Sequence, residues 1–464
     1  MTMPKNTHVR FVAMLACLLG AGCAGQPGEP KTADQAAAPP SYTVRPLKAQ
    51  AEALAANNIK RVDTLLLPAM RKAGISCWVT MSREFNEDFV LTYIQDERGD
   101  TGGHRNAYVF CDDGSDRVKR FAIGTHLPEH SALYDKLISY GRAQGPTGPS
   151  LKPMLRQVIE EFKPAKIGIN QSRTIPFCDG LTVEMKAFLV DAIGPVYAAR
   201  LVPAEQMIVD FLDTRLPDER PLMTEAADLT RAIHEEVLSN KAIEPGKSTV
   251  ADVKWYVHRR LAELQVVTWY MPIVRVDRAG GVESNDAIVI QPGDLVHTDI
   301  GVIYAGLYTD YQKNAYVLKP GETAAPAGLE KALANALRVQ DAIREVARPG
   351  KIGYVVKEEA EALAKTWGVS ASVYSHSVGL GGHGIGAWMN PNWPDRYGAR
   401  TTFPLRLGAY YSIESSGTTD VPEWGGQKVS IGTEENVFLT DQGYTTFYPR
   451  QEKLYIIKSG PAPK

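Results

Sequence analysis

Five side chains in the last third of this sequence have the residue types of a site for two metal ions. They are Asp299, Asp310, His383, Glu414 and Glu434. Carboxylate oxygens and a ring nitrogen are ligands that divalent cations accept, and a two-metal site needs carboxylates that can bridge both ions. The oxygen-rich set favours Mn²⁺ and also admits Fe²⁺, Co²⁺ or Zn²⁺. We therefore expect a cofactor of two divalent metal ions.

The first two acids flank a predicted hairpin. Two β-prone runs surround Ala305 and Gly306, and a hairpin centred between Tyr304 and Ala305 pairs Asp299 with Asp310 on one face. Two carboxylates opposed in this way repel each other unless cations lie between them. Taken alone, the segment predicts a solvated hairpin with two surface acids.

The three downstream residues favour the metal site. His383 lies among glycines in Gly-Gly-His-Gly-Ile-Gly, where the backbone can approach a ligand closely. Glu414 and Glu434 each follow apolar residues in predicted strands, 408–414 and 429–440. A carboxylate in a half-buried strand is costly unless it is paired or bound to a metal. Each residue alone has a simpler structural explanation, and only the set of five predicts a metal centre.

Five motifs resemble those of the M24 metallopeptidase superfamily, which includes methionine aminopeptidase, aminopeptidase P, prolidase and creatinase. They are Pro-Gly-Asp-Leu-Val-His-Thr-Asp299, Gly-Leu-Tyr-Thr-Asp310, His383-Gly-Ile-Gly, Ser-Ile-Glu414 and Glu434-Glu-Asn-Val-Phe-Leu-Thr. The resemblance implies that Asp299 binds one metal ion, that Asp310 and Glu434 bridge both ions, and that His383 and Glu414 bind the second. Glu423 and Glu435 lie nearby in the sequence but are left out of the ligand set.

The resemblance implies hydrolysis of a peptide bond near the N-terminus of a short peptide, as in Xaa-Pro aminopeptidases or dipeptidases. Glu414 would also help to move the proton. One departure bears on this function. Aminopeptidase P and prolidase keep a His seven residues after the ligand His and another four residues before it, and counting from His383 these positions are Asn390 and Gly379.

A third family histidine precedes the first ligand, yet this chain has no His between His258 and His297. We therefore consider His376 as a substitute catalytic imidazole, and His297, which alternates with Asp299, as a second residue facing the site. His258 is expected to be structural. The missing histidines leave two alternatives: a non-peptidase amide hydrolase of the creatinase-like fold, and a catalytically silent binding protein that uses the same cleft.

Two domains are expected to position these residues. The fold class is α+β, with a creatinase-like N-terminal α/β domain at 51–216 and a C-terminal pita-bread catalytic domain at 217–464. In the first domain, apolar patterns predict a helix at 61–74, a second at 155–162, and strands at 75–80, 107–111 and 166–169. In the second, they predict covering helices at 329–347 and 355–367, and a helix capped by Thr249 and Asp252.

The first residues predict export. Lys5 and Arg10 precede a short apolar run typical of a secretory signal at 1–22, and Leu-Gly-Ala-Gly-Cys23 resembles a bacterial lipobox, although Gly20 departs from its pattern. We expect lipidation at Cys23, a disordered Pro- and Ala-rich tether at 23–50, and a periplasmic enzyme that contacts the membrane only through this anchor. Members of the resembled family are often dimers, so the resemblance allows a homodimer.

Charge and cysteine content add two constraints. The formal net charge is −2, and no basic patch interleaved with aromatic residues favours nucleic acid as a partner. Beyond Cys17 and Cys23, only Cys77, Cys111 and Cys178 remain, and none forms a C-x-x-C motif. One disulfide with one free thiol and three buried thiols both stay open.

Overall fold

The structure is a computed structural model that describes residues 42–96, 105–125, 127, 130–140, 150–282 and 284–459. The predicted signal, Cys23 and most of the predicted tether lie outside these residues. The end of the tether was placed too late, because helix α1 (Leu47–Arg61) already begins at Leu47. Arg45 forms an ion pair with Glu225 at 2.6 Å, and this contact holds the chain just ahead of the helix.

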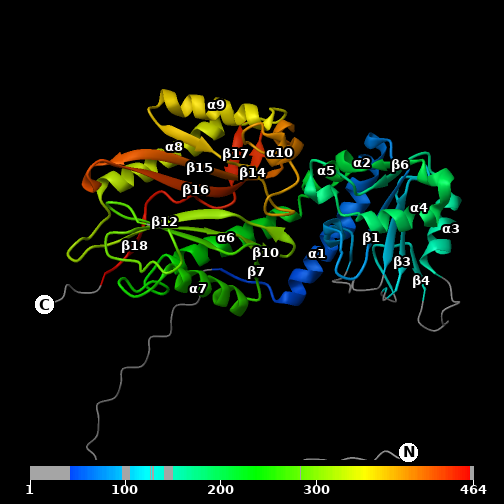
Figure 1. Cartoon of the computed structure of the whole chain (residues 1–464), viewed down its shortest axis with the longest axis horizontal. Helices are drawn as coiled ribbons and strands as arrows, with labels where there is room; N and C mark the ends of the chain where they lie inside the picture. Colours follow the sequence, from blue (N-terminus) through cyan, green and yellow to red (C-terminus); the bar gives the residue numbers. More distant parts are fainter. Residues whose placement is uncertain are drawn as a thin grey trace, which may run out of the picture. The chain divides into compact units, whose positions relative to one another are not determined.

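The N-terminal domain is built on a six-stranded sheet with the order β4-β3-β2-β1-β5-β6 (Figure 1). Its strands are β1 (Cys77–Ser82), β2 (Asn106–Cys111), β3 (Lys119–Gly124), β4 (Lys136–Ser139), β5 (Ile167–Ile169) and β6 (Leu201–Pro203). The strands predicted at 75–80, 107–111 and 166–169 correspond to β1, β2 and β5.

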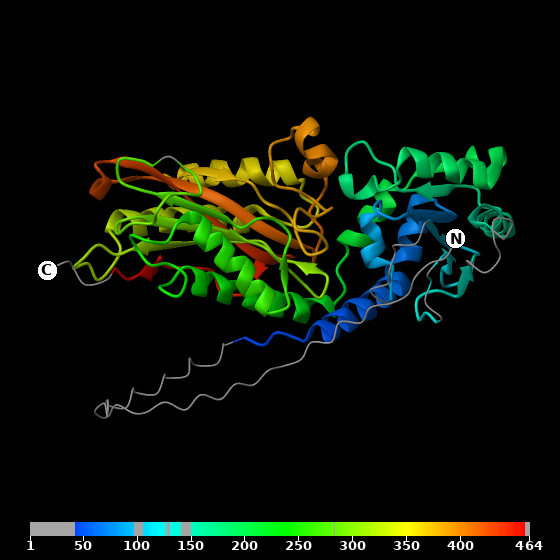
Figure 2. The same cartoon turned by 60° about the horizontal axis from the view of Figure 1, so that its bottom comes forward.

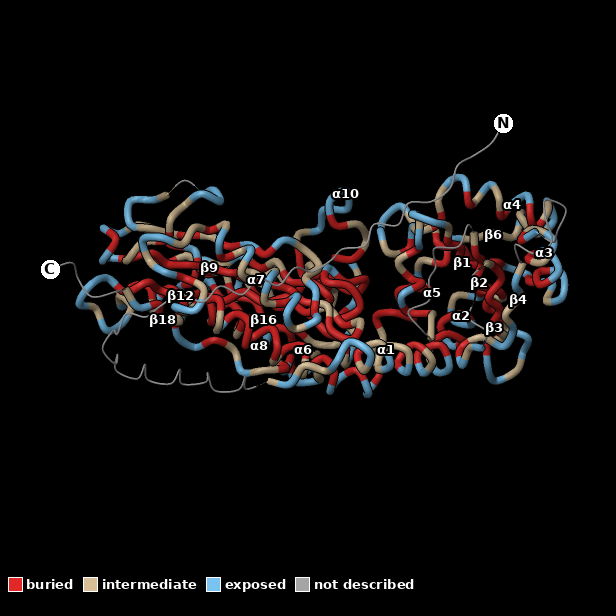
Figure 3. The backbone as a smooth tube through the Cα atoms, turned by 90° about the horizontal axis from the view of Figure 1, so that it is seen from below, coloured by how far each residue is buried: buried red, intermediate tan, exposed pale blue. Residues whose placement is uncertain are grey.

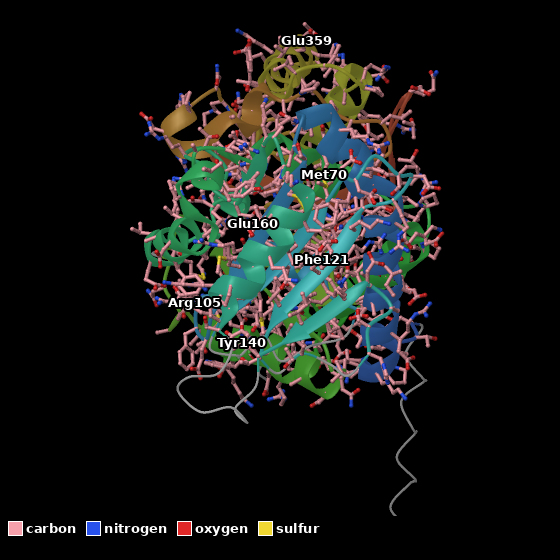
Figure 4. The ribbon with its side chains drawn as sticks, turned by 90° about the vertical axis from the view of Figure 1, so that its right-hand side faces the viewer. Met70, Arg105, Phe121, Tyr140, Glu160 and Glu359 are labelled. Atoms are coloured by element: carbon pink, nitrogen blue, oxygen red, sulfur yellow. A yellow bond between two sulfur atoms is a disulfide. The ribbon has the colours of Figure 1, made fainter. Side chains whose placement is uncertain are left out.

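Helices cover both faces of this sheet, as the alternation along β1 requires. Val79 packs in one cluster with Leu155 and Leu189 of α3 (Leu151–Phe162) and α4 (Val183–Ala198). Trp78 packs on the other face with residues of α2 (Leu67–Ala73) and α5 (Glu205–Asp213). Figure 4 views the α3 face, with Glu160 of that helix in front of the strand that carries Phe121.

The helix predicted at 61–74 is confirmed as part of a longer helical run. α1 continues through a π-helical turn, η1 (Val62–Leu66), into α2 (Figure 2). The run ends at Gly74, whose φ of 65° lies in the left-handed region that favours glycine at a helix end.

The cysteine alternatives are resolved by strand pairing. Cys77 on β1 lies opposite Cys111 on β2, with Cα atoms 4.1 Å apart, and the two form a disulfide. Cys178 is a buried free thiol. One disulfide with one free thiol is therefore the observed state.

The C-terminal domain is built on a nine-stranded sheet with the path β13-β15-β16-β12-β9-β8. These strands are β8 (Ile273–Asp277), β9 (Leu295–Ile300), β12 (Tyr311–Val317), β13 (Ser370–Val373), β15 (Tyr410–Val421) and β16 (Gln427–Thr440). Off this path, β14 (His376–Ser377) pairs with β15, β17 (Gly443–Thr446) with β16, and β18 (Tyr455–Ile457) with β12. A separate small sheet joins β7 (Val267–Thr268), β10 (Val302–Tyr304) and β11 (Leu307–Tyr308).

Two helix pairs support the large sheet: α6 (Glu219–Val237) with α7 (Val250–Glu263), and α8 (Ala327–Val346) with α9 (Gly353–Thr366). The predicted cap of α7 is confirmed, because Thr249 and Asp252 form a reciprocal capping box. His234 of α6 lies 2.9 Å from Thr298, and α8 packs against Gly417. By alternation, these contacts lie on the faces of β9 and β15 opposite to Asp299 and Glu414. The strands between them are buried (Figure 3).

The hairpin register differs from the prediction. Ala305 and Gly306 form the turn with φ values of 50° and 77°, the two positive values that a type I′ hairpin turn needs. Tyr304 then pairs with Leu307, and Asp299 lies opposite Gln312 rather than Asp310. The predicted pairing of Asp299 with Asp310 was wrong by two residues. Since two residues restore the same side of a strand, both acids can still serve one face.

The two halves of the large sheet meet at a narrow seam between β12 and β16. Gln312 and Glu434 are the one register pair that these strands share within the described residues. On one side of this pair, Asn436 donates to the Asp310 carbonyl oxygen at 2.7 Å and accepts from its N–H at 3.0 Å. On the other side, Asn314 donates to the Gly432 carbonyl oxygen at 2.8 Å. Asparagine side chains thus replace backbone pairing around the seam.

Candidate metal centre

Three of the predicted ligands lie in one row that crosses five strands of the large sheet. Glu414 pairs with Glu434, Glu434 with Gln312, Gln312 with Asp299, and Asp299 with Ile273. Residues paired in register point to the same face, so the three carboxylates project from one floor. The Gln312 amide donates to Glu414 at 2.8 Å, which fixes one carboxylate within the row. Gln312 has no place in the sequence prediction, although it alternates with Asp310.

Asp310 and two imidazoles complete the cluster. Three groups of side chains bring one ligand atom each to within 4.8 Å of one another: Asp299 with Asp310 and Glu434, His376 with Glu414 and Glu434, and Asp310 with His376 and His383. Asp310, Glu434 and His376 each belong to two groups. All five predicted ligands therefore lie close together. His376, which was predicted as a catalytic residue, lies in the same cluster.

The carboxylates repel one another in a largely buried setting. Burial raises the pKa of Asp310, Glu414 and Glu434 well above the usual carboxyl range, and the neighbouring acids raise it further. Burial also raises the pKa of Asp299 to about 6. Asp310 and Glu434 are 4% and 1% exposed, whereas Asp299 and Glu414 are partly exposed. Such a set fits divalent cations, whose charge would offset the repulsion.

Tyr270 is a further residue at the cluster that the sequence analysis missed. Its hydroxyl donates to Asp299 and lies 2.8 Å from Asp310. It joins two carboxylates that come from opposite sides of the hairpin. Nothing in the sequence around Tyr270 indicates this contact, because it lies in a loop ahead of β8.

His376 has the geometry of a metal ligand. Its ring is fully buried, and Nδ1 lies 3.1 Å from the Ser377 carbonyl oxygen. A carbonyl only accepts, so Nδ1 carries the proton and Nε2 of the neutral ring presents a lone pair. Burial lowers the pKa of His376 to about 4, which keeps the ring neutral.

The Nε2 lone pair of His376 faces acids rather than donors. Nε2 lies 3.6 Å from Glu434, 3.7 Å from Asp310 and 3.9 Å from Glu414, and it has no hydrogen-bond partner among the described residues. A lone pair aimed at three carboxylates is unfavourable by itself. A cation between these atoms would satisfy all four groups, so the residues present fit a metal ion.

His383 differs from His376 in its exposure and surroundings. It is exposed, and its ring lies 5.4 Å from the Trp269 ring and 5.2 Å from the Trp388 ring. The rings of His376 and His383 are 4.6 Å apart and nearly perpendicular. His383 thus stands beside the cluster where an incoming molecule can reach it.

Arg400 is a buried cation beside His383 that the sequence analysis also missed. It is 7% exposed, lies 3.8 Å above the Trp388 ring, and donates to backbone carbonyl oxygens of Tyr397 and His383 at 3.2 and 3.5 Å. No carboxylate forms an ion pair with it in the described part of the chain. Burial lowers its pKa to about 10. An unpaired buried guanidinium of this kind is suited to an anionic group of a ligand.

The remaining residues from the sequence analysis lie outside the cluster. Glu435 points to the opposite face, where it forms a buried ion pair with Lys313, and Glu423 accepts from the N–H of Gly328 at the start of α8. Asn390 is buried against the carbonyl oxygen of Ser375. His297 bonds Asn314 at 3.1 Å, and His258 contacts Met271 on the surface.

Comparisons with known proteins agree with this architecture. Residues 221–441 match the model of Metallopeptidase family M24. The chain is 24% identical over 315 residues to the uncharacterized peptidase YqhT of Bacillus subtilis, covering 67% of this chain and 80% of that protein.

Two solved structures show the same fold. The X-Pro aminopeptidase of Thermotoga maritima has a TM-score of 0.62 at 15% identity, covering 84% of this chain and 99% of that one. The Xaa-Pro dipeptidase of Bacillus anthracis has a TM-score of 0.60 at 17% identity, covering 87% and 99%. The α+β prediction is therefore confirmed: an N-terminal domain precedes a pita-bread catalytic domain, which carries the match to the M24 metallopeptidases.

Proposed function

We propose that this chain is a peptidase that uses two divalent metal ions to hydrolyse short peptides at a bond preceding proline. The observation that carries the proposal is the cluster of four carboxylates, three of which face Nε2 of His376, an atom without a hydrogen-bond partner among the described residues. Divalent ions bound there would activate a water nucleophile and polarise the scissile carbonyl. The identity of the ions stays a prediction, with Mn²⁺ favoured by the oxygen-rich ligands.

We assign the ligands with one change from the sequence analysis. Asp299, Asp310, Glu414, Glu434 and His376 would hold the two ions. His376 replaces His383, because His376 is buried and belongs to the group that contains Glu414 and Glu434.

This change also restores one of the three family histidines that the sequence analysis found missing. Counted from His376, the position seven residues later is His383 itself. Only the position four before, Ser372, and the upstream His then differ from aminopeptidase P and prolidase. The main argument for a non-peptidase hydrolase or a silent binding protein is thereby weakened.

The chain's own groups supply the other steps of hydrolysis. Glu414 has 25% of its side chain exposed, so its carboxylate can accept a proton from water and pass it to the leaving amine. Although part of His383 is exposed, the surrounding protein removes water from its ring and nearby Arg400 is positively charged, and together these lower the pKa of His383 to about 3. The neutral ring can donate to the substrate carbonyl. Arg400 can bind the free carboxylate of a dipeptide, which favours a dipeptidase over an aminopeptidase acting on longer chains.

Export and lipid anchoring stay part of the proposal. The signal-like run, the lipobox-like Cys23 and the Cys77–Cys111 disulfide support an oxidising compartment such as the periplasm. None of the helices within the described ranges is both long and apolar enough to cross a membrane. Homodimer formation stays a prediction.

The test combines metal analysis with a substrate screen. We expect up to two divalent ions per chain, inactivation by chelators, and cleavage of Xaa-Pro dipeptides. Arg400→Met should raise the KM for Xaa-Pro about 10–100-fold, because it removes a charge-assisted bond of about 1.5–3 kcal/mol. Arg396→Met is the matched control, since Arg396 is exposed and lies over Trp393 and Tyr397. A metal-loaded protein that cleaves other amides but no Xaa-Pro substrate would overturn the proposal.

A further inference from the structure

The loop that carries Arg400 is held by the N-terminal domain at a backbone contact. Gly398 begins the 3₁₀ turn η5 (Gly398–Thr402), and its φ of 63° with ψ of −153° is a conformation that side chains disfavour. A Cβ at Gly398 would overlap with the carbonyl oxygen of Thr174. Thr174 belongs to the N-terminal domain, between β5 and the 3₁₀ turn η4 (Pro176–Cys178). Only glycine therefore allows this approach.

The same N-terminal segment also contacts the loop that carries His383. A Cβ at Gly381, two residues before His383, would lie 2.6 Å from Cζ of Phe177. The Phe177 ring in turn packs edge-on against Phe89, with centroids 4.5 Å apart. Residues 172–178, which we name the clamp, thus contact both the loop that carries Arg400 and the loop that carries His383.

The clamp is itself fixed to α5. Ser172 donates to the Glu205 carboxylate, and Thr174 donates to the same carboxylate at 3.1 Å. The Ser172 hydroxyl accepts from the N–H groups of Thr174 and Ile175 at 3.0 and 2.9 Å. The position of the Thr174 carbonyl is therefore determined by the N-terminal domain rather than by the loop that it touches.

The other end of α5 fixes the same loop further along. Asp210 and Asp213 pair with Arg406 at 2.7 and 3.1 Å. Gly386 also approaches the Asp213 carboxylate so closely that a Cβ there would overlap with it. Residues 381–406, which include both His383 and Arg400, are thus held by the N-terminal domain near each end and in the middle.

We propose that the clamp is a positioning element that sets the distance between Arg400 and the metal cluster, and thereby makes a free C-terminal carboxylate the preferred substrate feature. The N-terminal domain then selects substrates whose free carboxylate reaches Arg400 when the scissile bond lies at the metal cluster. This inference rests on the proposed peptidase function. It adds a role for Ser172, Thr174, Phe177 and Gly398, none of which touches the cluster.

The test is Gly398→Ala, with Gly425→Ala as the matched control. Gly425 also has a positive φ, of 67°, but a Cβ there meets no atom within 4 Å. The probes are Ala-Pro and Ala-Pro amide, which lacks the free carboxylate. We expect Gly398→Ala to lower kcat/KM for Ala-Pro roughly 10–100-fold through KM, the scale of a misplacement of about 1 Å. The value for the amide should fall by a clearly smaller factor, since the amide owes nothing to Arg400 and senses only a shift of His383.

A second variant separates positioning from folding. Glu205→Gln weakens the anchor of the clamp without adding an atom to the loop, and it should shift the same substrate ratio in the same direction by a smaller factor. Metal content should match the parent in both variants, and Gly398→Ala should have a lower melting temperature but stay folded at the assay temperature. Equal losses on both probes, or an unchanged ratio in Gly398→Ala, would overturn the inference.

Binding of L-proline distinguishes failure of this inference from failure of the proposed function. If the parent cleaves neither probe, the proposed function fails, and calorimetry with L-proline still tests the clamp. Weaker binding of L-proline to Gly398→Ala than to Gly425→Ala supports positioning of Arg400. Equal binding to the two variants overturns it.

Discussion

Replacing Asp299 by Asn should stabilise the metal-free protein at neutral pH. Burial raises the pKa of Asp299 from 3.8 to about 6, so the folded state holds this proton more tightly than the unfolded state does. An acid whose folded pKa is raised loses stability as the pH rises between the two values. Asn carries no proton to lose. The parent therefore loses stability as the pH rises from 3.8 to about 6, and the variant does not.

The pKa difference sets the size of the effect. A shift of about two units corresponds to roughly 3 kcal/mol at pH 7.5. Because Asp299 keeps some contact with solvent, we expect about 1–2 kcal/mol. The other three carboxylates shift in the same direction, so ionised Asp299 also repels them in the parent.

Urea unfolding of chelated parent and Asp299→Asn at pH 4 and pH 7.5 measures this difference. The two proteins should have similar unfolding free energies at pH 4, and the variant should be more stable at pH 7.5. Added metal should reverse the order, because it binds the ionised parent and stabilises the folded state. A chelated parent at least as stable as the variant at pH 7.5 would refute the electrostatic argument.

Three further outcomes follow from the cluster and its surroundings. Asp310→Asn should abolish hydrolysis and weaken metal binding while circular dichroism stays unchanged; wild-type turnover would contradict a bridging role. His376→Gln should lose metal by mass spectrometry, whereas His383→Gln should keep it and lose roughly 10²–10⁴-fold in rate; the opposite pattern would restore the ligand assignment from the sequence. Glu435→Gln should destabilise the protein by about 3–5 kcal/mol in urea, because it leaves Lys313 buried without its partner. The double variant Lys313→Met/Glu435→Gln should recover part of that loss, and no recovery would argue against a charge effect.

The acids of the site could be predicted from sequence because they occur together in motifs of the resembled family, and three of them stand in strands where a carboxylate is costly. Asp299, Glu414 and Glu434 lie on β9, β15 and β16 and share one row. The hairpin register could not be predicted as easily. It depends on which two residues take positive φ, and Ala305 gives no sign that it does so.

The choice between two histidines could have been made from spacing. His376 and His383 are seven residues apart, which is the separation that the resembled family keeps between its ligand His and a later His. The glycines around His383 favoured that residue as the metal ligand in the sequence analysis, whereas our proposal assigns His376 as the ligand. Arg400 and Tyr270 had no comparable signal, since each reaches the site through a loop whose path depends on tertiary contacts.

The seam between β12 and β16 gives the metal centre a second consequence. One backbone pair, Gln312 with Glu434, joins the halves of the sheet there, together with a few side-chain contacts that include two asparagines and the Lys313–Glu435 ion pair. The carboxylates of Asp299 and Asp310 come from one half, and those of Glu414 and Glu434 from the other. Ions held between them would add a further link between the two halves. Loss of the ions would then remove this link as well as the chemistry, and we expect the metal-free protein to be cut by proteases faster than the metal-bound protein.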